Sequence, residues 1–324
     1  MSALLEVKDL KVDLMSVRGI VHALDGVNLT IEEGEIHGLV GESGCGKSMT
    51  SRAVMRLLPP ARSRISGQVL FRGSDLLPLH EREMRKIRGD RISLIFQDPM
   101  TSLNPLMTVG QQIGEVFRLH EGSTAAEART KTLAMLEKVG IYPPEKRIGQ
   151  YPHELSGGLQ QRVMIAMAIA NHPDLLIADE PTTALDVTIQ AQILELLKSL
   201  QRDTGMSILL ITHNFGVVAE VCDRVSVMYA GRIAESADTR TIFHNAAHPY
   251  SKALIDSIPK AGGTSKYLET IPGSPPELYN TQPGCPFAPR CAFADDQCAS
   301  AAPATRECGD APGHTAACWH PLCR

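Results

Sequence analysis

The sequence predicts an α/β domain built around a largely parallel sheet, followed by a small, irregular, cysteine-rich unit. Two observations predict the sheet: short apolar runs bounded by glycines or acids, and helical patterns that separate these runs. A third observation marks the second unit, because prolines, small residues and cysteines replace this alternation beyond about residue 236. Strands that alternate with helices are typical of a parallel sheet with crossover helices. We therefore expect a domain over residues 1–236 and an extension over residues 237–324.

The predicted strands are short and apolar, as buried strands of a parallel sheet usually are. They lie at residues 34–41, 69–71, 92–96, 175–178, 208–212 and 225–229. The segment between Gln97 and Ser156 has a helical pattern, so we expect a helical subdomain over about residues 98–170.

The predicted helices have recognisable ends. One helix covers Met49–Leu58, and another begins after the capping-box residue Thr124 and stops at Gly140. Asp186 can cap a third helix that ends at Gly205.

The composition excludes several classes of protein. The chain has 324 residues, of which 43% are hydrophobic and 21% are charged, so a folded core is expected. The net charge of −4 argues against a dedicated nucleic-acid binder. An apolar run of about 18 residues, which a membrane span requires, is not visible, and neither is a secretory signal. We expect the chain in the cytosol, or docked on a membrane through a partner.

Residues 41–48, GESGCGKS, match the phosphate-binding pattern G-x-x-x-x-G-K-[ST] in full. Glycines let backbone N–H groups face phosphate oxygens, and the following helix adds its positive N-terminal end. Lys47 should reach the β- and γ-phosphates, and the Ser48 hydroxyl should ligate Mg²⁺. Cys45 lies near Lys47 and a helix N-terminus, which predicts a reactive thiolate. The expected ATP-binding residues here are Gly41, Ser43, Gly44, Cys45, Gly46, Lys47, Ser48 and Met49.

Two further motifs fit a nucleotide site. Asp179 and Glu180 end an apolar run, where Asp179 would help to hold Mg²⁺ and Glu180 would take a proton from the attacking water. Ser156, Gly157 and Gly158 precede a helical run and form a second anion site. Because the phosphates are already held at residues 41–48, we expect this second site to face another nucleotide.

The order of these motifs resembles the nucleotide-binding subunit of an ABC transporter over roughly residues 4–236, with LSGGLQQR followed by DEPTTALD. The resemblance implies a head-to-tail dimer that encloses two ATP molecules. In that dimer Ser156 and Gly158 would contact the γ-phosphate of the partner's ATP. The remaining roles would be these: Gln97 senses Mg²⁺ and the attacking water, Asp186, at the end of the motif Ala184-Leu185-Asp186, crosses the interface, and His213 holds the γ-phosphate and orients Glu180.

Two segments resemble dipeptide/oligopeptide importers in particular. Residues 96–105 are similar to their extended Q-loop, and His248-Pro249-Tyr250 is similar to the element that opens their C-terminal extension. The resemblance implies a second ATPase subunit, for which we favour a heterodimer, two transmembrane permease subunits and an extracytoplasmic peptide-binding protein. It places the chain at the cytoplasmic face of a bacterial inner membrane. The alternatives are an importer of nickel or an opine, or a soluble ABC ATPase without a transport role.

Six of the eight cysteines lie between residues 285 and 323. In a chain of cytosolic character, reduced thiols that bind a metal are the better interpretation. Four thiolates suit a [4Fe–4S] cluster and also Zn²⁺. A resemblance to the four-cysteine iron–sulfur loop of several importer ATPases favours the cluster. The expected ligands are Cys285, Cys291, Cys298 and Cys318, with Cys308 or Cys323 as alternatives to Cys318.

Three features depart from the family pattern, one of which is Cys45 at a loop position where serine is common. Residues 1–70 contain no aromatic residue to stack on adenine, so His22 or Arg18 is the expected substitute. Asn214 follows His213 where an aspartate is usual, which affects how the histidine is positioned.

Overall fold

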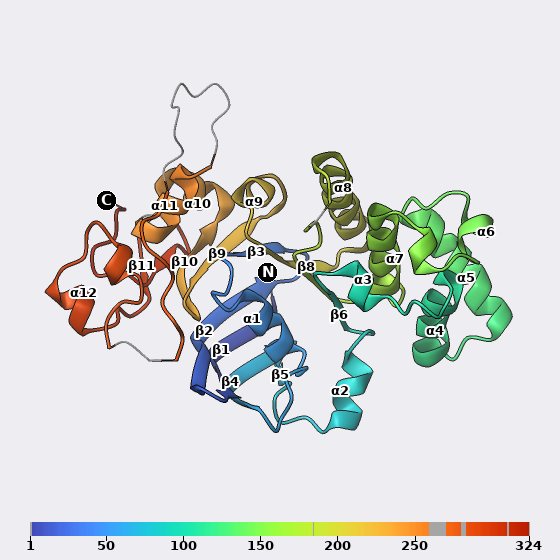
Figure 1. Ribbon diagram of the computed structural model, residues 1–324, viewed down its shortest axis with the longest axis horizontal. Helices are drawn as coiled ribbons and strands as arrows, with labels where there is room; N and C mark the ends of the chain where they lie inside the picture. Colours follow the sequence, from blue (N-terminus) through green and yellow to red (C-terminus); the bar gives the residue numbers. More distant parts are fainter. Residues whose placement is uncertain (1, 184, 259–269, 280–282, 310, 324) are drawn as a thin grey trace. The chain divides into compact units, whose positions relative to one another are not determined.

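The computed structural model describes residues 2–183, 185–258, 270–279, 283–309 and 311–323 (Figure 1). The chain divides into two compact units. Unit 1 comprises Met1–Leu77 and Ile211–Arg324, and unit 2 comprises Pro78–Leu210. Both contain strands and helices, so the predicted α/β class is confirmed. The predicted helical subdomain, residues 98–170, lies within unit 2.

Unit 1 contains an antiparallel sheet that the sequence analysis did not predict. Its order is β2-β1-β4-β5, from β1 (Ala3–Ser16), β2 (Gly19–Glu32), β4 (Ser63–Phe71) and β5 (Ser74–Asp75). The run at residues 69–71 was expected in the parallel sheet, but it pairs antiparallel with β1. Bulges interrupt the β1–β2 register at several points, which breaks the simple alternation of apolar and polar residues by which a strand is recognised.

Unit 1 contains a second group of strands, one of which immediately precedes the phosphate loop. It is formed by β3 (Ile36–Val40), β9 (Arg224–Tyr229), β10 (Arg232–Asp238), β11 (Arg306–Glu307) and β12 (Thr315–Ala316). The strands β3 and β9 are parallel, and β10 pairs antiparallel with β9 and β12. The C-terminal extension was predicted to be irregular, but it contributes two short strands. Of these, β12 pairs with β10, and β11 pairs with β12. Because β10 continues to residue 238, it crosses the predicted domain boundary at 236.

Unit 1 also contains helices, most of which are labelled in Figure 1. They are α1 (Lys47–Val54), α9 (Phe215–Val221), α10 (Thr239–Asn245), α11 (Pro249–Asp256), the short η2 (Ala288–Arg290) and α12 (Asp296–Ser300). The helix α1 is shorter than the predicted Met49–Leu58, because Met55 is its C-cap and Arg56 has a φ of 50°.

Unit 2 contains two parallel strands, β6 (Ile92–Ile95) and β7 (Leu175–Asp179). In residues 98–155 every regular element is a helix, as the sequence pattern predicted, and these helices gather in one part of Figure 1. The helices of the unit are α2 (Glu81–Ile87), α3 (Pro99–Ser102), α4 (Val109–Glu121), α5 (Ala125–Lys138), α6 (Pro144–Arg147), η1 (Pro152–Glu154), α7 (Gly157–Ile169) and α8 (Val187–Thr204). The predicted caps are confirmed at Thr124, Asp186 and Gly205. Strand β8 (Ser207–Thr212) contains the boundary between the two units.

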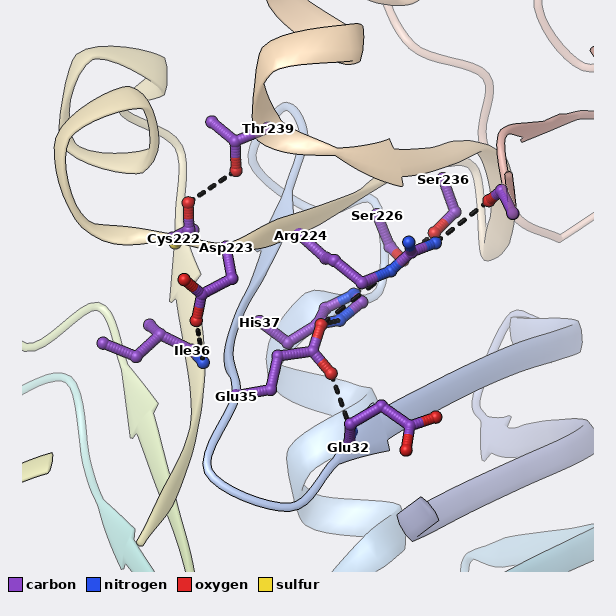
Figure 2. Close-up of polar contacts among 11 residues, drawn as sticks. Glu32, Glu35, Ile36, His37, Cys222, Asp223, Arg224, Ser226, Ser236 and Thr239 are labelled. Carbon is purple, nitrogen blue, oxygen red and sulfur yellow. Dashed lines mark hydrogen bonds and ion pairs between the residues drawn. The ribbon is translucent and has the colours of Figure 1, made fainter. Parts of the chain in front are cut away.

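A buried polar network fixes β3 just before the phosphate loop (Figure 2). His37 is 1% exposed, and both ring nitrogens have partners: Nδ1 lies 3.0 Å from Glu35 Oε1 and Nε2 lies 2.9 Å from Ser226 Oγ. Asp223 accepts a 2.8 Å hydrogen bond from the backbone N–H of Ile36. Buried polar groups are tolerated when they are paired. The network therefore ties β3 to β9 and sets the direction in which the chain enters the loop.

Candidate functional site

The phosphate loop lies between β3 and α1, as predicted. Gly41 has a φ of 152°, and a Cβ there would lie 2.2 Å from the Met228 carbonyl oxygen, so a larger residue cannot fit. Lys47 is 5% exposed. Its Nζ donates to the carbonyl oxygens of Gly41 and Glu42, at 2.8 and 2.9 Å. The loop thus holds its own lysine in place through two backbone carbonyls.

Cys45 lies in this loop but does not have the properties expected of a reactive thiol. Its side chain is buried, at 5% exposure, and the Lys47 Nζ lies 3.9 Å from its Sγ. Burial raises the pKa of the Cys45 thiol, and this effect exceeds the lowering of the pKa by Lys47. The structure therefore contradicts the predicted thiolate, because burial disfavours the charged form of the thiol.

We expect Cys45 to react slowly with iodoacetamide at neutral pH. A rate at least about tenfold below that of the unfolded chain should follow from burial and the raised pKa. Mass spectrometry of the Cys45 peptide after timed labelling measures this rate, and labelling in denaturant provides the reference. Equal rates in folded and unfolded protein would contradict the structure.

In unit 2 the predicted catalytic carboxylate is held by two donors. The Glu180 Oε2 accepts from Gln97 Nε2 at 3.1 Å and from Thr183 Oγ1 at 2.8 Å. Glu180 follows Asp179 at the end of β7 and has a φ of 48°, in the left-handed region. Such strain at a non-glycine residue is found most often at functional sites. The structure thus brings Gln97 and Glu180 together, and it adds Thr183, which the sequence analysis did not single out.

The second predicted anion site is at the start of α7. Ser156 occupies the N-cap position, but its side chain makes no capping hydrogen bond. A Cβ at Gly158 would lie 2.8 Å from Ile189 Cγ2 on α8, so glycine allows the two helices to approach closely. Asp186 Oδ1 accepts from the backbone N–H of Ile189 at 2.9 Å. Ala184, which belongs to the predicted interface segment, lies outside the described residues.

His213 directly follows β8, belongs to unit 1 and is exposed. The next residue, Asn214, is the N-cap of α9, where its Oδ1 accepts from the backbone N–H of Gly216 at 2.9 Å. An aspartate would cap the helix equally well. The unusual asparagine therefore preserves the backbone that carries His213 and changes only the charge beside it.

The two candidates for adenine stacking lie in or beside the β1–β2 hairpin. The His22 Nδ1 lies 2.7 Å from Asp13 Oδ1, so an ionic partner already orients this ring. The His22 backbone N–H donates to the Leu278 carbonyl at 2.9 Å. Arg18 lies in the turn between the strands and is exposed. The structure thus brings a segment of the C-terminal extension to the hairpin, which the sequence did not indicate.

The four cysteines that were predicted as metal ligands lie in the C-terminal extension. Burial raises the pKa of the Cys318 thiol to about 11. The backbone N–H of Cys285 also donates to the Cys298 carbonyl at 2.7 Å. By ligand chemistry alone, four thiolates suit either a [4Fe–4S] cluster or Zn²⁺.

Cys308 and Cys323 form a separate pair. Burial raises the pKa of Cys308 to about 11, and the neighbouring Cys323 thiol adds to this rise. Both pack with Ala247 and Ala316 in a small apolar cluster. Cys308 and Cys323 thus have each other as neighbours.

One group of possible metal ligands, which includes Cys298, was missed by the sequence analysis. Ligand atoms of Asp295, Cys298 and His320 lie within 4.8 Å of one another, whereas the four predicted cysteines, all of them described, do not meet this criterion as a set. The His320 Nε2 lies 2.8 Å from Asp295 Oδ2. Their separation in sequence hid this group, because its members come from α12, its N-cap and the segment after Cys318.

The His248-Pro249-Tyr250 element begins α11 and touches the phosphate loop. His248 is the N-cap, and its side chain accepts from the backbone N–H of Tyr250 at 3.0 Å. Burial lowers the pKa of His248 to about 4, which keeps the imidazole neutral and able to accept. The buried Tyr250 places its hydroxyl 3.0 Å from the Glu42 backbone N–H, which donates to it. This element therefore supports the phosphate loop directly.

The comparisons with known proteins agree with this geometry. Residues 24–183 match the ABC transporter family, and residues 234–298 match the family described as oligopeptide/dipeptide transporter, C-terminal region. The probable peptide ABC transporter ATP-binding protein y4tR of Sinorhizobium fredii is 51% identical, over 98% of this chain and 94% of its own length. The dipeptide transport ATP-binding protein DppD of Bacillus subtilis is 50% identical, over 98% of this chain and 95% of its own.

A solved structure has the same fold. It is a dimeric ATP-binding cassette in a post-hydrolysis state, bound to ADP and phosphate. Its TM-score is 0.65 at 31% identity, and the match covers 73% of this chain and 99% of that one. A mixed α/β fold with this phosphate loop defines an ATPase of the cassette type, for which ATP and Mg²⁺ are the expected substrate and cofactor. The chain belongs to the ABC transporter family. Among the described residues, no helix combines the length and the apolar character that a membrane span needs.

Proposed function

We propose that this chain hydrolyses ATP to energise the uptake of dipeptides or oligopeptides through an ABC importer. The observation that carries the proposal is the C-terminal extension. It matches the oligopeptide/dipeptide transporter region over residues 234–298, and its Tyr250 contacts the phosphate loop. The relatives named as peptide and dipeptide transport ATP-binding proteins support the same cargo along nearly the whole chain.

The proposed roles of the site residues follow the sequence analysis. Lys47 binds the β- and γ-phosphates, while Ser48, Asp179 and Gln97 hold or sense Mg²⁺. Glu180 accepts a proton from the attacking water, and its hydrogen bond from Gln97 supports this role by orienting the carboxylate. His213 holds the γ-phosphate and helps to orient Glu180.

A complete site requires a second ATPase subunit. The Ser156 hydroxyl is not used to cap α7, which leaves it for the phosphate of a nucleotide on the partner subunit. The solved cassette with a matching fold is dimeric, which supports this arrangement. We propose a heterodimer on two transmembrane permease subunits, fed by an extracytoplasmic peptide-binding protein. The chain would then be peripheral on the cytoplasmic face of a bacterial inner membrane, with Asp186 at the subunit interface.

We further propose that Cys285, Cys291, Cys298 and Cys318 hold a [4Fe–4S] cluster, with Zn²⁺ as the alternative. All four lie in the C-terminal extension, and the family resemblance favours the cluster. A bound cluster would supply one-electron redox chemistry, whereas zinc would serve only to hold the structure together. In either case the four thiolates would join segments that are separated by up to 33 positions in the sequence.

Uptake in reconstituted vesicles tests the proposed function. The full-length chain, assembled with its permease partners and binding protein, should accumulate a labelled tripeptide only when MgATP is supplied on the side of this subunit. Nickel and an opine serve as competing cargoes in the same vesicles. Accumulation of nickel or the opine instead of the peptide would support the role as an importer ATPase and contradict the proposed peptide cargo. Failure of the chain to purify with any membrane subunit would favour a soluble ABC ATPase.

A further inference from the structure

Arg290 of the C-terminal extension forms an ion pair with a residue of the phosphate loop. It ends η2, next to Cys291, and its side chain is 5% exposed. Its Nη1 donates to Glu42 Oε2 at 2.6 Å and its Nη2 donates to Glu42 Oε1 at 3.0 Å. Glu42 is the second residue of the loop, directly after Gly41. A two-point contact between a guanidinium and a carboxylate is both strong and directional.

Other contacts fix the direction of the Arg290 side chain. Its Nε donates to the Pro272 carbonyl at 2.9 Å, and its Nη1 also donates to the Tyr229 hydroxyl at 3.2 Å. Its guanidinium lies 5.8 Å from the Tyr229 ring centroid and 6.0 Å from that of Phe287. A side chain that is held by a carbonyl, a hydroxyl and two rings has few accessible rotamers, so its contact with Glu42 costs little conformational entropy. Arg290 therefore presents a fixed partner to Glu42.

Glu42 in turn orders the groups that receive phosphate. Its backbone N–H is held by Tyr250, and its carbonyl accepts from Lys47 Nζ at 2.9 Å and from the backbone N–H of Cys45 at 3.4 Å. Two residues of the extension, Arg290 and Tyr250, thus fix the same loop residue through its side chain and its main chain. The carbonyl between these two anchors sets the position of Lys47 before nucleotide arrives.

We propose that Arg290 is a positioning residue for the nucleotide site, through which the C-terminal extension keeps the phosphate loop in a binding-ready form. Without Arg290 the loop must be ordered by the nucleotide itself, and that cost appears as weaker binding. Arg290 acts through Glu42, so we expect the proton transfer at Glu180 to be unaffected. The inference goes beyond the proposed function, because it applies whichever cargo the transporter carries.

Equilibrium binding of MgATP to the full-length chain tests this proposal. Arg290→Gln should weaken binding about tenfold, in line with the loss of a buried charge-assisted contact, and Arg290→Lys should restore part of the affinity. Glu42→Gln should weaken binding similarly. The double variant should lose little more than either single variant, because both remove the same interaction. In the assembled transporter the KM for ATP should rise while kcat stays within about twofold.

Arg306→Gln is the matched control. Arg306 belongs to the same extension, but its guanidinium lies over the Trp319 ring, 5.1 Å from the centroid, so ATP affinity should not change. Metal content of each variant is measured in parallel, because Arg290 adjoins Cys291. If Arg290→Gln loses metal, its ATP affinity cannot be compared directly with that of the wild type. The affinity of Glu42→Gln then tests the proposal, because Glu42 lies outside the cysteine-rich segment and its substitution should not affect a metal site. Unchanged ATP affinity in Glu42→Gln, or additive losses in the double variant, would overturn the proposal.

Discussion

A Glu180→Gln variant should bind MgATP as tightly as the wild-type chain and hydrolyse it about 10²–10⁴-fold more slowly, the range expected when general acid–base catalysis is lost. The amide oxygen of glutamine can still accept from Gln97 and Thr183, which donate to Glu180 Oε2 at 3.1 and 2.8 Å. The site should therefore keep its shape and lose only the basic oxygen.

Two measurements separate binding from chemistry in this variant. Equilibrium binding on the full-length chain reports affinity, and phosphate release from the assembled transporter reports turnover. Glu195→Gln is a matched control, because Glu195 lies on α8 with its side chain 63% exposed and paired with Arg202. Turnover within twofold of wild type in Glu180→Gln would assign the base to another residue.

Local sequence signals located much of this site. The glycine pattern at residues 41–48 requires a strand before it and a helix after it, and both are present as β3 and α1. The caps at Thr124 and Asp186 depend on side chains that bond within three residues, so short-range sequence is sufficient to find them. The antiparallel ribbon β1–β2 was missed because bulges obscure its alternation.

The contacts that the sequence could not reveal join distant segments. Arg290 and Glu42 are 248 positions apart, and neither has an unusual neighbour that marks the pairing. Cys45 was predicted from its neighbours to be ionised, but burial, which depends on the folded loop, decides its pKa. The pairing of Cys308 with Cys323, and the group of Asp295, Cys298 and His320, likewise follow from the path of the extension.

Substitution of the C-terminal cysteines should divide them into two classes. Cys318→Ser should abolish the metal centre, because it removes one of the four proposed ligands. Cys308→Ser and Cys323→Ser should retain the metal, because these two thiols contact each other in a separate apolar cluster. Iron, zinc and sulfide analysis of anaerobically purified protein measures the outcome. Loss of metal in Cys308→Ser together with its retention in Cys318→Ser would show that the ligand set is wrong.

Trp319 should report which metal is bound. The indole follows Cys318 directly, and its Nε1 donates to the Ala301 carbonyl at 2.9 Å while Arg306 covers the ring. A [4Fe–4S] centre absorbs in the near ultraviolet and visible, so it should quench this single tryptophan by energy transfer. Zn²⁺ is d¹⁰ and colourless and should leave the emission bright. Brown, dim wild-type protein that brightens on oxidation, beside colourless and bright Cys318→Ser, is the expected result. A colourless, bright wild type with stoichiometric zinc would replace the cluster by a zinc site on the same thiolates.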